Sequence, residues 1–107
     1  GNALVVNLAS IAGKSPQPWL SVYSATKAAV IAFTQAMNKE LNAQGIKSAA
    51  FCPGFVDTDM TEFAKSSVSA EEMLRPEDMA QALRFLLNVS PACVVPEIIF
   101  QRPGETV

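Results

Sequence analysis

Three short stretches rich in apolar residues divide this 107-residue chain, at about 3–8, 46–51 and 94–100. The first and third are apolar runs rather than alternating patterns, which is typical of strands covered on both faces of a sheet. Pro53 and Gly54 end the second run, because neither residue continues a strand well. The pattern therefore predicts three short buried strands.

Two helices are expected between these strands. Apolar residues recur at helical spacing from about 21 to 43, and Gly45 is suited to the left-handed conformation that ends a helix. Pro76 suits a first helical position, and acidic residues follow it, so a second helix is expected over 76–88. Residues 69–72 have capping-box spacing and predict one short helical turn. The order strand, helix, strand, helix, strand predicts a parallel sheet and an α/β fold.

Composition limits the classes of function. Half of the residues are hydrophobic and 17% are charged, which excludes an intrinsically disordered chain. The net charge of −2 gives no electrostatic reason to expect nucleic acid or an anionic membrane as a partner. No apolar run approaches the roughly 20 residues of a membrane span. A soluble cytoplasmic protein is therefore expected.

The two cysteines do not indicate a metal site. Cys52 and Cys93 are far apart in the sequence, and the chain has no histidine. Zinc sites need several closely spaced cysteine or histidine ligands. No metal is therefore expected, and both cysteines are interpreted as buried, reduced thiols.

Candidate chemistry centres on Tyr23 and Lys27, with Ser10 thirteen residues before the tyrosine. Residues four apart share one face of a helix, so the phenol and the ammonium are expected side by side. A free phenol has a pKa of about 10, and a nearby positive charge favours its anion. Ser10 follows the first strand and would hydrogen-bond a carbonyl oxygen held against the phenol. These groups suit proton donation to a carbonyl, and hydride would have to come from a nicotinamide cofactor.

Each residue also has a structural explanation. Many helices contain a Tyr-x-x-x-Lys spacing, and a tyrosine near a helix start often only packs against its neighbours. A serine after a strand is often a helix cap. The combination of all three, in order, at a strand end and a helix start favours the catalytic interpretation.

Three motifs together resemble a known family. Asn7-Leu8-Ala9-Ser10-x-x-Gly13, Tyr23-x-x-x-Lys27 and Pro53-Gly54-x-Val56-x-Thr58 are similar to the second half of the short-chain dehydrogenase/reductase family. The resemblance implies that residues 1–107 form the C-terminal catalytic half of a doubly wound parallel, Rossmann-type sheet, without the N-terminal cofactor-binding half. It also implies carbonyl reduction or alcohol oxidation on a small molecule, with NAD or NADP as cofactor and a slight preference for NADP.

The resemblance assigns roles to residues. Ser10, Tyr23 and Lys27 match the catalytic serine, tyrosine and lysine, and the latter two also contact the cofactor. The third motif implies four further positions that contact the cofactor: Pro53, Gly54, Val56 and Thr58. Phe55, Met60 and Phe63 fall in the variable substrate loop, where pocket lining and plain packing remain equally open.

The long helix is implied to pack against a symmetry mate in a dimer or tetramer of the full-length protein. Ala29, Phe33, Ala36 and Met37 suit that contact, although packing against the sheet explains them equally well.

The sequence departs from the family pattern at two places. None of its five glycines has the GxxxGxG spacing of the cofactor-binding turn. The last strand, 94–100, also differs from the Val-Asp-Gly-Gly type of ending. A second hypothesis therefore stands beside the oxidoreductase, namely a catalytically silent fragment or an interaction module that uses half of this fold.

Overall fold

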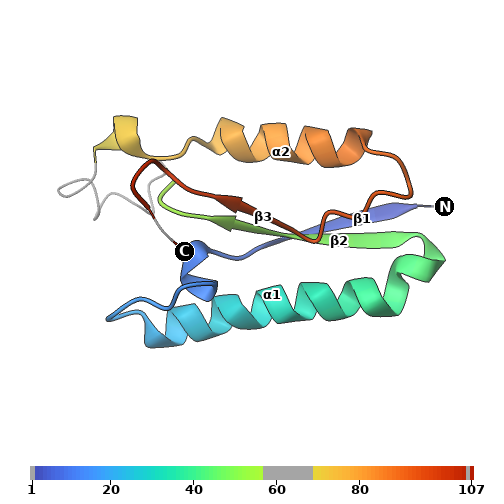
Figure 1. Cartoon of the computed structure of the whole chain (residues 1–107), viewed down its shortest axis with the longest axis horizontal. Helices are drawn as coiled ribbons and strands as arrows, with labels where there is room; N and C mark the ends of the chain where they lie inside the picture. Colours follow the sequence, from blue (N-terminus) through green and yellow to red (C-terminus); the bar gives the residue numbers. More distant parts are fainter. Residues whose placement is uncertain (1, 57–68, 106) are drawn as a thin grey trace.

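The computed structural model describes residues 2–56, 69–105 and 107. Over these residues the chain forms three layers, with one helix on each face of a parallel sheet (Figure 1). Strands β1 (Ala3–Leu8), β2 (Ile46–Pro53) and β3 (Glu97–Phe100) lie side by side in sequence order. Helices α1 (Ser21–Leu41) and α2 (Pro76–Asn88) connect them. The predicted α/β class, with strictly parallel strands, is confirmed.

Short 3-10 turns complete the described chain. They are η1 (Ile11–Gly13) after β1, η2 (Asn42–Gln44) after α1, and η4 (Ala70–Glu72) before α2. Gly45 has a φ of 84°, the left-handed conformation expected where a helix gives way to a strand. The bounds of β1 and α2 are those predicted, whereas β2 extends two residues further than expected.

Strand β3 is shorter than the predicted 94–100, because it begins only at Glu97. Next to residues 94–96, the backbone of Ser48 in β2 would need partners from a longer β3. The side chain of Asn38 supplies them: its Oδ1 accepts from the Ser48 N–H at 2.7 Å, and its Nδ2 donates to the Ser48 carbonyl at 2.9 Å. Pro96 has no N–H to give the ladder, and its carbonyl accepts from the Ala50 N–H. A helix side chain thus replaces the missing part of an edge strand.

The sheet separates two apolar layers. On the α1 face, Ile31 packs over Ala50 and Cys52 of β2. On the α2 face, Leu86 packs with Ala49 and Phe51, and partly buried side chains of β1 and β3 surround them. The rings of Phe51 and Phe100 meet edge to face, with centroids 5.3 Å apart.

Helix α1 presents an unusually polar face to the sheet. Its buried residues are Ser24, Ile31, Thr34 and Asn38. Thr34 accepts a hydrogen bond from the Asn7 amide of β1 and donates one to the Val30 carbonyl, so its burial leaves no polar atom unpaired. Phe33, by contrast, is 59% exposed, so packing against the sheet does not account for it.

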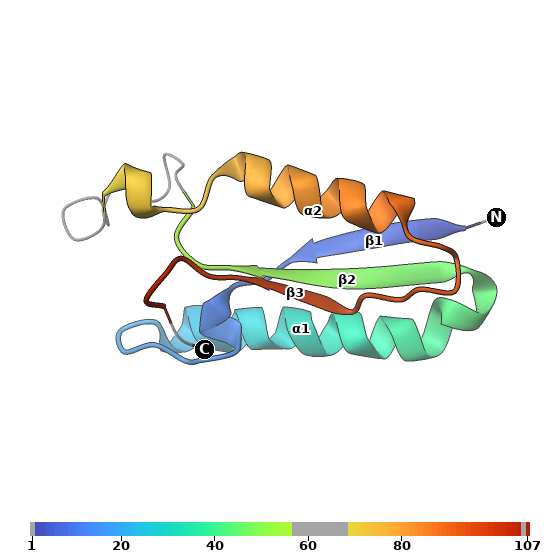
Figure 2. The ribbon, with the colours of Figure 1, turned by 45° about the horizontal axis from the view of Figure 1, so that its top comes forward.

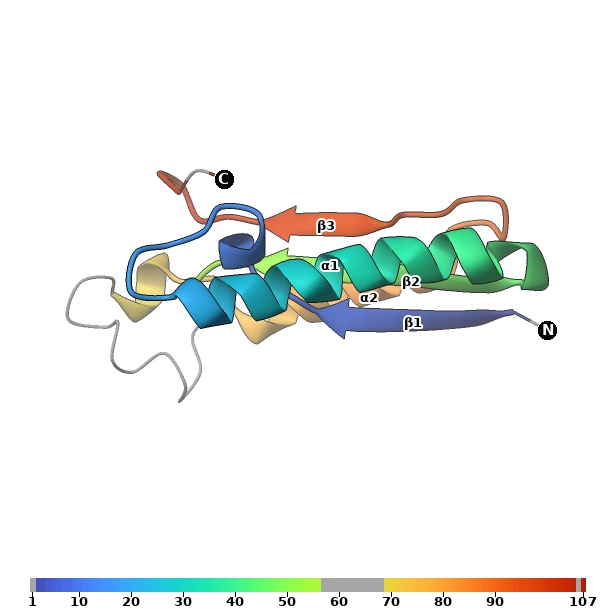
Figure 3. The same cartoon turned by 90° about the horizontal axis from the view of Figure 1, so that it is seen from below.

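Helix α1 covers only part of its face of the sheet. Seen from the α1 side, the helix lies over β1 and β2, and β3 lies to one side (Figure 3). No helix among the described residues has the length and apolar character needed to cross a membrane.

Candidate active site

The candidate residues gather at the carboxyl end of the sheet. Helix α1 runs back along the strands, so its first turn lies at the end where β1 leaves the sheet and enters η1 (Figure 2). Ser10, at the start of η1, and Tyr23, in the first turn of α1, are thereby brought to the same edge. This edge is where parallel α/β sheets bind ligands.

Lys27 and Tyr23 lie side by side, as the helical spacing predicts. The Lys27 ammonium is 5.6 Å from the centre of the Tyr23 ring. The same ammonium donates a hydrogen bond to the Leu8 carbonyl, at 3.3 Å. Because an ammonium has three N–H groups, two remain for other acceptors. Tyr23 is 44% exposed, so the described residues do not enclose its side chain.

Ser10 is buried, with 8% of its surface exposed. Its Oγ accepts a hydrogen bond from the Ala12 N–H at 3.1 Å and thereby caps η1. The capping role considered from the sequence is therefore real. It does not exclude the catalytic role, because a hydroxyl that accepts one bond still has its own proton to donate.

Gly13 allows η1 to pack directly on α1. A β-carbon at this position would lie 2.8 Å from the Lys27 carbonyl carbon and 2.9 Å from the Ala28 nitrogen. Both are backbone atoms of a helix and cannot move aside separately. The glycine therefore sets the distance between the Ser10 turn and the Tyr23–Lys27 turn.

Gly13→Ala is expected to destabilise the chain by about 1–3 kcal/mol, because overpacking against rigid backbone forces η1 away from α1. Urea unfolding followed by circular dichroism measures this loss. Gln81→Ala, an exposed change in α2, serves as the control and should leave the midpoint in place. An unchanged midpoint for Gly13→Ala would show that η1 does not depend on this close contact.

The Pro53–Gly54 turn ends β2 at the same edge, and the Gly54 N–H donates to the Phe100 carbonyl. Phe55 packs against the buried Met73. Val56 forms an isolated parallel bridge with Leu74.

Three of the predicted site residues, Thr58, Met60 and Phe63, lie outside the described residues.

Residues after β3 also reach this edge, which the sequence did not predict. A β-carbon on Gly54 would lie 2.5 Å from a carboxylate oxygen of Glu105. That carboxylate accepts from the Arg102 N–H at 2.8 Å, and its side chain is 9% exposed. Glu105 is therefore packed against the Pro53–Gly54 turn of the candidate site.

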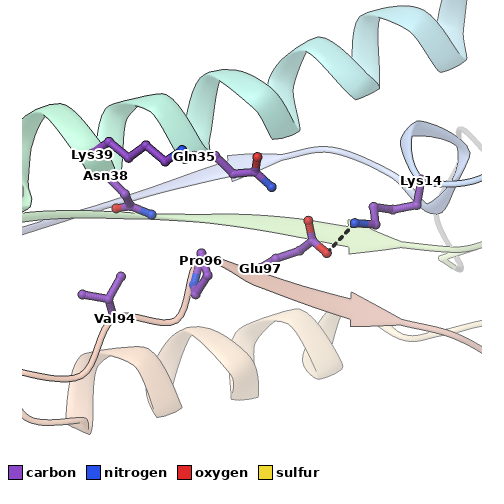
Figure 4. Close-up of a pocket in the computed structure, with 7 residues that line it drawn as sticks. All are labelled: Lys14, Gln35, Asn38, Lys39, Val94, Pro96 and Glu97. Atoms are coloured by element: carbon purple, nitrogen blue, oxygen red, sulfur yellow. Dashed lines mark ion pairs between the residues drawn. The ribbon is translucent and has the colours of Figure 1, made fainter.

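A separate groove of about 530 Å³ lies between α1 and β3 (Figure 4). Its walls carry Lys14, Gln35 and Lys39 on one side and Pro96 and Glu97 on the other. It does not include Ser10, Tyr23 or Lys27. It follows from α1 covering only two of the three strands.

Both cysteines are unpaired. Cys52 is fully buried, whereas Cys93 is only partly buried, so the prediction of two buried thiols is wrong for Cys93. Burial, and next the negative charge of Glu97, raise the pKa of the Cys52 thiol to about 11, whereas Lys14 lowers it. The thiol is therefore neutral near pH 7 and not poised as a nucleophile. In the described part of the chain, no group of three or more possible metal ligands occurs.

Comparison with known proteins bears on the same residues. Residues 1–69 match the family model described as short chain dehydrogenase. The chain is 36% identical to a 3-oxoacyl-(acyl-carrier-protein) reductase of a Synechocystis species, covering 96% of this chain and 44% of the relative. It is 40% identical to an uncharacterized oxidoreductase of Staphylococcus haemolyticus, covering 96% of this chain and 43% of the relative.

Solved structures agree with this match. A β-ketoacyl-ACP reductase from Bacteroides thetaiotaomicron superposes with a TM-score of 0.77 at 32% identity, covering 94% of this chain and 40% of that one. A variant of actinorhodin polyketide ketoreductase, solved with NADPH, has a TM-score of 0.79 at 28% identity, covering 92% and 45%. The chain thus spans less than half the length of each of these proteins.

Proposed function

This chain belongs to the short-chain dehydrogenase/reductase family, and we propose that it carries the proton-transfer residues of an oxidoreductase that interconverts a carbonyl and an alcohol. The observation that carries the proposal is the position of the Lys27 ammonium, hydrogen-bonded to the end of β1 and lying beside the Tyr23 ring. A fixed positive charge next to a reachable phenol is what proton donation by tyrosine requires.

Tyr23 is the proposed acid. In reduction its hydroxyl gives a proton to the carbonyl oxygen as negative charge develops there, and in oxidation it takes the proton back. The proposed role of Lys27 is to offset the negative charge of the phenolate that forms, since its ammonium lies 5.6 Å from the centre of the Tyr23 ring. The Leu8 carbonyl keeps this ammonium in place without neutralising it.

Ser10 is proposed to hold the substrate. Its hydroxyl proton, not used in capping η1, donates to the carbonyl oxygen and stabilises negative charge on it. The hydrogen bond from the Ala12 N–H to Ser10 Oγ holds the serine side chain in place, so Ser10 needs little reorganisation to bind the substrate. The substrate is a small carbonyl compound or the corresponding alcohol.

The residues present fit the nicotinamide end of a dinucleotide. Lys27 has N–H groups free for sugar hydroxyls, Tyr23 lies beside it, and the Pro53–Gly54 turn lies at the same edge of the sheet. When bound, the nicotinamide supplies or accepts the hydride. We further assign the backbone of Val56 and the side chain of Thr58 to the cofactor, as the family motif implies.

Either nicotinamide cofactor remains compatible with the relatives. The ketoreductase variant at 28% identity is described with NADPH, and a 4-hydroxyisoleucine dehydrogenase at 25% identity with NADH. We retain a slight preference for NADP. We also propose a cytoplasmic location and a homo-oligomeric state, a dimer or tetramer.

The decisive experiment joins this chain to the part of the Synechocystis reductase that it does not match. The chimera is expected to oxidise NADPH or NADH in the presence of a 3-oxoacyl thioester, followed by loss of nicotinamide absorbance. The thioester is chosen as the probe because that relative is named for such substrates. A folded chimera that turns over no carbonyl substrate and binds neither cofactor would refute the proposed function.

The alternative hypothesis from the sequence is a catalytically silent binding module. Titration of the 107-residue chain alone with NADH and NADPH separates the two candidates. Micromolar binding by the chain alone would exclude the silent module.

A further inference from the structure

We propose that the ion pair between Lys14 and Glu97 positions Ser10 at the candidate active site. The two residues are positioning residues, since neither reaches the reacting atoms. The catalytic part of this inference rests on the proposed function. Its structural part, the orientation of the Ser10 turn, does not.

The Ser10 turn is held from two directions by backbone contacts. Before the turn, the Ala9 N–H donates to the Phe51 carbonyl of β2 at 2.7 Å. At its end, Gly13 rests on the backbone of α1. Neither contact reaches β3, so the side of the turn that faces β3 depends on other groups.

Lys14 supplies that third connection. It follows Gly13 directly, and its N–H donates to the Ile11 carbonyl and closes η1. Its ammonium lies 2.9 Å from a carboxylate oxygen of Glu97, the first residue of β3 (Figure 4). The pair therefore joins the last residue of the turn to the outer strand of the sheet.

The environment of the pair makes it stronger than an exposed one. The Glu97 side chain is 19% exposed and that of Lys14 is 32% exposed. The second carboxylate oxygen of Glu97 is buried and has no hydrogen-bond partner among the described residues. Removing the lysine would leave a partly buried charge without its counter-ion, which costs far more than breaking a surface pair.

Other charges near the groove do not replace Lys14. Lys39 also lines the groove, from a later turn of α1, but the ion pair of Glu97 in the described chain is with Lys14. The remaining titratable neighbour is the neutral thiol of Cys52. Among the ion pairs of the described residues, Lys14–Glu97 is the one that connects the Ser10 turn to β3.

Hydrogen exchange of single amides in the 107-residue chain tests the structural part. The Ala12 N–H reports directly, because Ser10 Oγ is its acceptor. Lys14→Met and Glu97→Gln are each expected to speed its exchange about tenfold. The Ser48 N–H, bound to Asn38 on the same face of the sheet, is the internal control and should change less than about twofold.

Two further variants keep the test decisive. Lys14→Arg preserves the charge, and the exchange of Lys14→Glu with Glu97→Lys reverses the pair. Both should restore the Ala12 rate to within about threefold of the original. Unchanged Ala12 exchange in Lys14→Met would overturn the proposal. So would an equal rise in exchange at Ala12 and Ser48, because that result reports only a general loss of stability.

The chimera tests the catalytic part. Lys14→Met is expected to lower kcat per folded molecule about tenfold with little change in KM, because Ser10 acts on the charge that develops in the transition state. Lys14→Arg should recover kcat. If Lys14→Met lowered only the folded fraction and left kcat per folded molecule unchanged, the catalytic part of the proposal would be contradicted. An inactive parent chimera would count against the proposed function, and the exchange data would still decide the positioning.

Discussion

Replacing Tyr23 with phenylalanine is expected to lower carbonyl reduction by the chimera about 10²- to 10⁴-fold, the range contributed by one general acid. The loss should fall on kcat, because the hydroxyl acts in proton transfer, while cofactor affinity changes much less. Stability should be retained, since Tyr23 is 44% exposed and the phenyl ring keeps its contacts. Steady-state kinetics and thermal unfolding of the same preparation measure both quantities.

Trp19→Phe provides the matched control for loss of an aromatic polar group near the start of α1. Trp19 is fully exposed and has no assigned role, so kcat and KM should stay within about twofold. If Tyr23→Phe retained most of the parent rate, Tyr23 would not be the acid. Cofactor binding by the same variant would then show whether only the proton donor had been misassigned.

Replacing Asn38 with leucine is expected to destabilise the chain by about 2–6 kcal/mol. The Asn38 amide satisfies both the N–H and the carbonyl of Ser48, and Ser48 is 1% exposed. A leucine of similar size leaves both groups buried and unpaired, at about 1–3 kcal/mol each. Since small domains have only about 5–15 kcal/mol of stability, the loss should be plain in urea unfolding.

The control for this variant is Gln35→Leu, one turn earlier on the same helix and exposed. Both substitutions replace a side-chain amide with leucine, but only Asn38→Leu removes hydrogen-bond partners from the Ser48 backbone of β2. Gln35→Leu should therefore alter stability by less than about 1 kcal/mol. Equal effects of the two substitutions would mean that Ser48 does not depend on Asn38.

The order of elements could be predicted because it depends on local patterns. The apolar run at residues 3–8 and the Pro76 helix start are signals within a few residues of the element they define, and both match the observed bounds. The predicted start of β3 was three residues too early. Residues 94 and 95 are apolar, as in a strand, and nothing in the local sequence shows that Asn38 of α1 makes the hydrogen bonds to Ser48 that a longer β3 would make.

In the candidate site, too, the sequence predicted the local arrangement but not the contacts between distant segments. Tyr23 and Lys27 are four residues apart on one helix, so helical geometry alone brings them together. The position of Glu105 against Gly54 joins residues far apart in the sequence, and neither residue belongs to a motif that predicts the contact. The sequence analysis did not single out Glu97, although a glutamate within an otherwise apolar strand is a signal that could have marked this position.

The sequence by itself determined the fold class, the strand–helix order and the pairing of Tyr23 with Lys27, because each depends on periodicity or on short spacing. Only the tertiary structure decided what lies opposite these residues. The Leu8 carbonyl at the Lys27 ammonium, Asn38 at the Ser48 backbone and Lys14 at Glu97 are contacts between separate elements. Their distances follow from how the helices and turns pack on the sheet, which no local pattern encodes.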